Sequence, residues 1–225
     1  MKNSLPYLTT PKLCIACGKN IAIPRYLFCP LCLESLPRTN FHLTKGNAME
    51  HKLYGKVDIE KATAFCYFEK GSNIRGAIHL FKYRNYGTLA EHLAYIYGLE
   101  LNKENWFDGI DLIVPVPIHW YKKYKRGYNQ SMLIALGISK ATGIKICSGL
   151  INSKKKESQT KKNFFERSEN IQNSIISRRK IKQKLGHILI VDDVLTSGST
   201  IAATAKVLQG ISNVKISILV IGYAK

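Results

Sequence analysis

The last forty residues of the chain hold the pattern that most restricts its fold. "GHILIVDD" is an apolar run that stops at two adjacent aspartates, and "VLTSGST" follows as a turn of small, hydroxylated residues. "STIAATAKVLQG" then has the spacing of a helix, and "VKISILVIGYA" is a second apolar run. Two strands buried on both faces and joined by a helix predict a parallel pair with a right-handed crossover.

The same alternation of strand and helix patterns occurs earlier in the chain. "KATAFCYFEKG" and "IDLIVPVPI" predict strands, and the helical spacing between them is interrupted near Gly87. "NQSMLIALGISKATG" predicts a helix with Gly143 beyond its end. We therefore expect an α/β fold, a parallel sheet flanked by helices. We expect residues 61–225 to form this domain, residues 1–45 a small cysteine-rich module, and residues 46–60 a linker without strong periodicity.

The aspartate pair and the turn after it predict a ligand site. In open α/β sheets ligands bind beyond the carboxyl ends of the strands, where Asp192 and Asp193 are expected. Backbone amides of the turn, with Gly198 allowing close approach, suit a phosphate at the start of a helix. The carboxylates would repel that phosphate and suit sugar hydroxyls instead, so the stretch predicts a ribose 5-phosphate site. The alternative is a helix start with acidic residues, a hydroxylated cap and a turn glycine.

Four of the six cysteines form two Cys-x-x-Cys pairs separated by eleven residues: Cys14, Cys17, Cys29 and Cys32. Two such pairs supply four thiolates to one tetrahedral metal ion, and Gly18 suits the tight turn after the first pair. Disulfides are the alternative, and a reducing cytosol disfavours them. We expect one Zn²⁺ ion with a structural role, because four sulfur ligands leave no open position. Cys66 and Cys147 lie in apolar surroundings and are expected in the core.

The charge of the chain predicts a polyanionic partner. It has 34 Lys and Arg against 15 Asp and Glu, a net charge of +19, and residues 153–184 contain eleven basic and three acidic residues. Phe164 and Phe165 within that segment suit stacking on bases, or alternatively a core position. Compositional bias of the genome would explain the lysines but not the scarcity of acids. No apolar run is long enough for a membrane span or a secretory signal, so we expect a cytoplasmic protein without membrane insertion.

"ILIVDDVLTSGST" resembles the phosphoribosyl-pyrophosphate (PRPP) binding motif of type I phosphoribosyltransferases, with Ser197 where the family usually has Thr or Ala. Together with the four-cysteine module, "LFKYRNYG", "VPVPIHWYKKYKRGYNQS" and "SQTKKNFFERSEN", in that order, it makes nearly the whole chain similar to the ComF family of competence-related proteins. The resemblance implies a phosphoribosyltransferase-like domain after an N-terminal zinc finger. It also implies PRPP binding by Asp192, Asp193, Thr196, Ser197, Gly198, Ser199 and Thr200.

The resemblance assigns further residues to the site. It implies a pyrophosphate side formed by Val116, Pro117, Arg126, Gly127, Asn129 and Gln130. It implies a hood loop, and our candidate contacts for DNA, at Lys154, Lys155, Lys156, Gln159, Arg167 and Asn170. Lys82 is similar to a family lysine, with a solvated helix lysine as the alternative. The hood departs from the family pattern at Asn152 and Lys156, where the family often has arginine and threonine, and at Ile175, where an aromatic residue is common. A lysine offers a point charge and not the bidentate fork of an arginine.

Two functions follow from the resemblance. In the first, the chain supports DNA uptake and natural transformation, binds single-stranded DNA, and meets a DNA-uptake helicase or another DNA-processing protein. In the second, it is an active phosphoribosyltransferase that uses PRPP with Mg²⁺, with Asp192 and Asp193 as the candidate catalytic residues. No segment identifies an acceptor base, so whether the chain is an enzyme stays open at this point.

Overall fold

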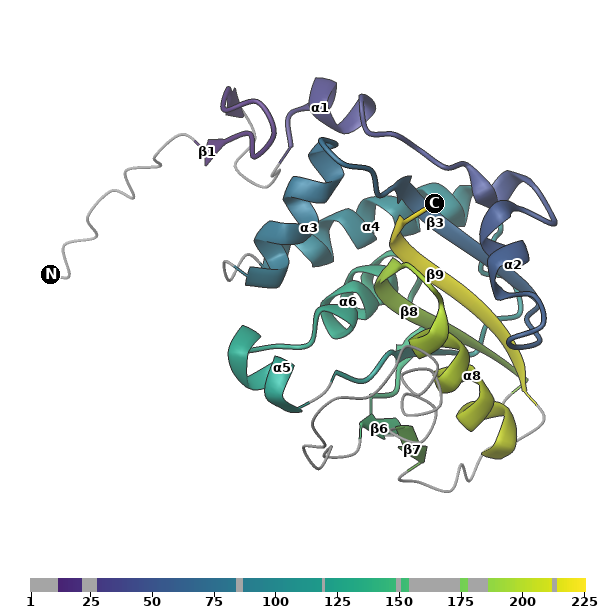
Figure 1. Cartoon of the computed structure of the whole chain (residues 1–225). Helices are drawn as coiled ribbons and strands as arrows, with labels where there is room; N and C mark the ends of the chain where they lie inside the picture. Colours follow the sequence, from purple (N-terminus) through teal and green to yellow (C-terminus); the bar gives the residue numbers. More distant parts are fainter. Residues whose placement is uncertain are drawn as a thin grey trace, which may run out of the picture.

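A computed structural model describes residues 12–21, 28–83, 87–118, 120–148, 151–153, 175–177, 186–211 and 214–225. Its centre is a five-stranded sheet in which every neighbouring pair is parallel, as the sequence predicts. The strand order is β3 (Lys61–Tyr67), β9 (Lys215–Tyr223), β8 (His187–Leu195), β4 (Leu112–Pro115) and β5 (Lys145–Ile146). The predicted α/β fold is confirmed, and Figure 1 shows the sheet between its helices.

The helices end where the local sequence requires. α3 (Asn73–Tyr83) and α4 (Gly87–Lys103) are separated near Gly87, as the spacing predicts. α6 (Gln130–Thr142) follows the short α5 (Trp120–Arg126) and ends at Gly143, which adopts the left-handed conformation that favours glycine, with φ 77°. α8 (Ser199–Ile211) begins directly after the turn that follows β8.

The side chains of each strand alternate between two apolar layers. Leu189 and Val191 of β8 pack with α3, α4 and α6, whereas Ile188 and Ile190 pack with α8 on the other face. Both layers are fully buried around the central strands, which explains why these strands are almost continuously apolar. No helix in the described part of the chain combines the length and apolar character needed to cross a bilayer.

The order of the strands creates a switch point at one edge of the sheet. From β4 the chain passes through α5 and α6 to β5 on one side, and from β8 it passes through α8 to β9 on the other. The connections therefore diverge between two adjacent strands, β4 and β8. Such a switch point, at the carboxyl ends of the strands, is where α/β sheets bind ligands.

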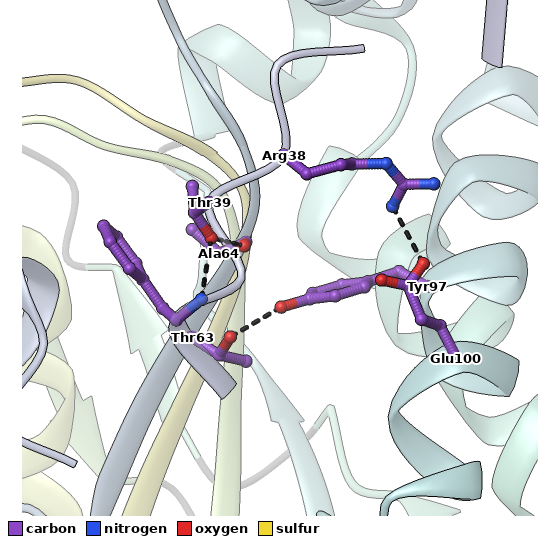
Figure 2. A network of polar contacts seen from close by, with 7 residues as sticks. Arg38, Thr39, Thr63, Ala64, Tyr97 and Glu100 are labelled. Carbon is purple, nitrogen blue, oxygen red and sulfur yellow. Dashed lines mark hydrogen bonds and ion pairs between the residues drawn. The ribbon is translucent and has the colours of Figure 1, made fainter. Parts of the chain in front are cut away.

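Residues 37–39 connect the cysteine module to the edge of the sheet. Arg38 pairs with Cys66 in an isolated antiparallel bridge, which covers part of the open edge of β3. Its guanidinium donates to Glu100 Oε2 of α4 at 2.9 Å and stacks over the Phe65 ring. In Figure 2, Tyr97 of α4 points back to β3, where its hydroxyl shares a 2.6 Å hydrogen bond with Thr63. This network joins α4, β3 and the segment leaving the module.

The segment 46–60, predicted as a linker, contains a helix and is packed onto the core. The short η1 (Phe41–Leu43) precedes α2 (Ala48–Leu53), whose Met49 and Leu53 are fully buried in the layer that includes α8. Asn47 caps α2 by accepting from the amides of Met49 and Glu50. Six residues are too few to give a periodic signal, which is why the sequence pattern did not predict this helix.

Two small sheets complete the described structure. β1 (Lys12–Leu13) and β2 (Asn20–Ile21) form an antiparallel pair beside the first two cysteines, and α1 (Pro30–Glu34) carries the last. Cys14, Ile21 and Phe28 belong to the same apolar layer as α3 and α4, so the module packs on the sheet domain. β6 (Ile151–Ser153) pairs with β7 (Ile175–Ser177).

Candidate functional site

Asp192 and Asp193 lie at the switch point of the sheet. Val191 is the last residue of β8 to pair with β4, opposite Pro115, so both aspartates extend beyond the end of that neighbouring strand. On the other side β8 continues along β9 as far as Leu195. The acid pair therefore lies within β8 at the carboxyl edge of the sheet, where the sequence predicts it, just beyond the end of β4.

The carboxylate of Asp192 is held by two donors. Its Oδ1 accepts from the Ser131 hydroxyl at 2.8 Å and from the Asp193 backbone amide at 2.8 Å. Burial of the carboxyl group, with the negative charge of Asp193 beside it, raises the pKa of Asp192 to about 7, although the Ser131 hydrogen bond opposes this shift. A carboxyl group with such a displaced pKa at the carboxyl edge of a parallel sheet is typical of a functional site.

Asp193 is paired with a lysine from a distant helix. Lys82 Nζ, in the last turn of α3, lies 2.9 Å from Asp193 Oδ2, and the two side chains are 20% and 13% exposed. The alternative of a solvated helix lysine therefore does not hold for Lys82. The pair neutralises one of two adjacent carboxylates and joins α3 to the end of β8.

The start of α6 is organised around the same corner. Asn129 caps the helix by accepting from the Ser131 amide at 3.2 Å, and its side-chain amide donates to the Val116 carbonyl at 3.1 Å. Its side chain thus ties α6 to the loop after β4, which contains Val116 and Pro117. Ser131 is buried and was not singled out by sequence reasoning, although it lies in the "YNQS" part of a family motif.

Arg126 and Gln130 form a second contact beside this corner. Arg126 Nη1 donates to Gln130 Oε1 at 3.0 Å, and Gln130 is only 2% exposed. The Nε2 atom of Gln130 has no hydrogen-bond partner among the described residues. Gly127, with φ 81°, makes the turn between α5 and α6. A buried amide donor and a guanidinium thus lie together near the predicted pyrophosphate side.

The turn after β8 exposes its hydroxyl groups. Thr196, Ser197 and Thr200 are exposed and Ser199 is half-buried. Gly198 has φ 76°, and its carbonyl accepts from the Ala202 amide at 2.8 Å as α8 begins. The Ser197 and Ser199 hydroxyls lie 3.0 Å apart. This arrangement leaves the first amides of a thirteen-residue helix beside small donors, which suits an anion.

The turn is supported by α2 and the residues after it. Lys56 Nζ donates to the Ser197 carbonyl at 2.8 Å. A Cβ atom at Gly198 would lie 2.9 Å from Leu53 Cδ2, so only glycine fits between the turn and α2. Neither Leu53 nor Lys56 has a sequence signal that links it to a turn more than 140 residues away.

The four predicted zinc ligands lie together at the N-terminal module. Their sulfur atoms are all within 4.8 Å of one another, and Cys17 Sγ is 3.8 Å from Cys29 Sγ. Sulfurs about 2.3 Å from a tetrahedral zinc ion would be about 3.8 Å apart, so the cluster fits this metal. Although burial opposes ionisation, hydrogen bonds from the backbone amides of Cys29, Cys17 and Ala16 lower the pKa of the Cys14 thiol to about 6. Cys66 is fully buried and Cys147 half-buried, away from the cluster.

The predicted hood residues lie outside the described part of the chain: Lys154, Lys155, Lys156, Gln159, Arg167 and Asn170. The same holds for Phe164 and Phe165. Of this region the structure describes the β6 and β7 backbones, in which Asn152 pairs with Ile176 and Ser153 with Ile175. The hood contacts stay predictions.

Two relatives are similar to the chain over most of its length. It is 25% identical over 219 residues to DNA utilization protein YhgH of Escherichia coli (strain K12), with 89% of this chain and 92% of that protein covered. It is 24% identical over 211 residues to competence protein F of Haemophilus influenzae, with 87% and 90% covered. No protein-family model matches the chain. The two relatives confirm the resemblance predicted from the sequence.

Proposed function

We propose that this ComF-like chain supports DNA uptake, binds single-stranded DNA, and carries a ribose-phosphate site of the PRPP type. The names of the two relatives, one a DNA utilization protein and the other a competence protein, support the role in DNA uptake. The net charge of +19 and the basic segment 153–184 support binding to a polyanion. The proposed place of action is the cytoplasm, where thiolates such as the four of the zinc module stay reduced.

The observation that carries the sugar-phosphate site is the corner of Asp192, Asp193, Ser131 and Lys82 at the switch point. The two carboxylates are held in place by groups from α6 and α3, so their remaining oxygen atoms are positioned to accept from the two hydroxyls of a ribose. The turn 196–200 supplies amides and hydroxyls for the 5-phosphate. Aspartates on the sugar and amides on the phosphate divide the ligand by charge, which the alternative of a simple helix start does not explain.

The same corner can take a pyrophosphate group. Arg126 and the buried amide of Gln130 are a cationic and a neutral donor on the α6 side. Magnesium would enter with PRPP as part of the ligand. The four-sulfur cluster is proposed to hold structural zinc, because its geometry fits the metal and leaves no position for water.

Calorimetry with PRPP and magnesium tests the sugar-phosphate site. We expect the parent chain to bind, and Asp193→Asn to bind about 10- to 150-fold more weakly, as expected for loss of a hydrogen bond to a charged acceptor. Asp108→Asn is the matched control, because it removes the same charge from an exposed residue far along the chain from the site. No heat with the parent chain, or equal losses in both variants, would exclude the proposed site.

Release of pyrophosphate separates binding from catalysis. Incubating the parent chain with PRPP, magnesium and a panel of bases should give no release above the buffer rate if the pocket only binds the ligand. Release that depends on one base, and that Asp193→Asn abolishes, would instead establish the phosphoribosyltransferase reaction. Filter binding with labelled single-stranded DNA tests the other half of the proposal, with affinity expected to fall steeply as salt rises.

A further inference from the structure

The helix α5 exposes two large aromatic side chains. Tyr121 is 57% exposed and Tyr124 is 85% exposed. They stand three positions apart on a seven-residue helix, a spacing that places both on the same side. More than half of each side chain is therefore accessible to a ligand.

The same helix is strongly basic. Its sequence, WYKKYKR, contains four basic residues and no acidic one, with Lys123 exposed between the two tyrosines. Alternating cationic and aromatic residues are the composition of surfaces that bind single-stranded nucleic acid, where phosphates meet the cations and bases stack on the rings. A protein interface would instead mix charges or bury an apolar centre.

The position of α5 places this surface beside the proposed sugar-phosphate site. It follows the end of β4, and its last residue, Arg126, donates to Gln130 at the start of α6. The next residue of α6, Ser131, bonds Asp192. Figure 1 shows α5 at the outer edge of the molecule, before the chain turns back into α6. A polynucleotide lying on α5 would therefore reach the rim of the sugar-phosphate site.

We propose that α5 is a stacking surface on which single-stranded DNA places two bases against Tyr121 and Tyr124. Lys123, exposed between the two rings, contacts a phosphate of the strand. This assignment rests on the proposed binding of single-stranded DNA and locates it on residues other than those predicted for the hood. Because every base has an aromatic face, the surface binds without regard to sequence.

Affinity measurements on a labelled oligothymidylate test the stacking. Tyr124→Ser and Tyr121→Ser should each weaken binding by about 5- to 150-fold. Tyr124→Phe should bind as tightly as the parent chain, because stacking needs the ring and not the hydroxyl. The salt dependence should keep its slope in both serine variants, whereas Lys123→Gln should reduce that slope by about one. Tyr95→Ser on α4, a partly exposed tyrosine outside any lysine run, is the matched control and should bind as the parent does.

Photocrosslinking identifies the contact directly. An oligonucleotide carrying 5-iodouracil should crosslink to peptides containing Tyr121 or Tyr124. If the parent binds DNA but the crosslinks fall elsewhere and the tyrosine variants keep full affinity, the stacking surface is refuted while DNA binding stands. If the parent does not bind DNA at all, the proposed function fails as well. Binding of α5 to phosphatidylserine vesicles in place of DNA would reassign the surface to a membrane and overturn the proposal.

Discussion

The two sides of the proposed sugar-phosphate site, called here its α6 wall and its α8 wall, are built in different ways. On the α6 wall, Asn129, Ser131 and Asp192 are tied together by hydrogen bonds between side chains and backbone, and Gln130 is almost fully buried. On the α8 wall, the turn exposes Thr196, Ser197 and Thr200. One wall is a packed polar network, and the other is a backbone turn with open hydroxyl groups.

The difference shows which property each wall depends on. The network places two carboxylates in a partly buried corner, so its behaviour should follow charge and protonation. The turn depends on one glycine conformation and on support from α2, so its behaviour should follow steric fit. Substitutions on the two walls should therefore differ in their pH dependence as well as in size.

The largest effect is expected for Gly198→Ala on the turn wall. The substitution strains a left-handed residue and places a methyl group 2.9 Å from Leu53, so we expect a loss of about 2–4 kcal/mol in the free energy of unfolding, measured by urea denaturation. Affinity for ribose 5-phosphate should fall with it.

Gly127→Ala is the control for Gly198→Ala. Gly127 has a similar φ of 81°, but no atom of the described residues lies within 4 Å of an added Cβ, so only the conformational cost of about 1–2 kcal/mol is expected. Equal losses in the two variants would show that contact with α2 does not restrict the turn. Both losses should be independent of pH between 5 and 8.

Asp192→Asn tests the other wall and should depend on pH. Because the folded-state pKa of Asp192 is raised, the folded chain binds the proton more tightly than the unfolded chain, and stability is lost as the pH rises from about 4 to about 7. The asparagine variant does not titrate there and keeps an acceptor oxygen for Ser131. The free energy of unfolding of the variant, relative to that of the parent, should therefore rise by at least about 1 kcal/mol between pH 4 and pH 8.

Unfolding of parent and variant in parallel across this pH range gives the measurement for Asp192→Asn. The difference between the two chains cancels effects common to both, including protonation of Cys14. A difference that stays constant from pH 4 to pH 8 would contradict the assigned charge state. The effect of Asp193→Asn on stability should differ from that of Asp192→Asn, because it also leaves Lys82 without its carboxylate partner.

The elements with long, regular patterns were predictable from the sequence. β8 begins with the apolar run that precedes the two aspartates, β9 is almost entirely apolar, and α8 starts at Ser199, where the hydroxylated turn ends. The position of the acid pair followed from the same pattern, because a buried strand in a parallel sheet must end at the edge where ligands bind. The spacing of the cysteines was sufficient to predict that their four sulfur atoms lie together.

The contacts that hold the site could not be predicted, because they join segments distant in the sequence. Ser131 reaches Asp192 across 61 positions, and only the adjacency of β4 and β8 places the start of α6 beside it. Lys82 pairs with Asp193 because α3 packs on the same face of the sheet as α4 and α6. α2 is stabilised by burying Met49 and Leu53, and a tertiary contact of this kind leaves no periodic pattern in six residues.

The smallest effect is expected for Lys56, the residue that adds a positive charge to the turn wall. Its ammonium group donates to the Ser197 carbonyl from an exposed position, so it both orients the turn and adds positive potential near a bound phosphate. Lys56→Gln should weaken ribose 5-phosphate binding by about 2- to 5-fold and leave the unfolding midpoint nearly unchanged. Lys103→Gln, at the exposed end of α4, removes the same charge far along the chain from the turn. A loss of the same size in both variants would mean that the net charge of the chain, and not the contact with Ser197, attracts the phosphate. The turn wall would then depend on steric fit only, with no contribution from the charge of Lys56.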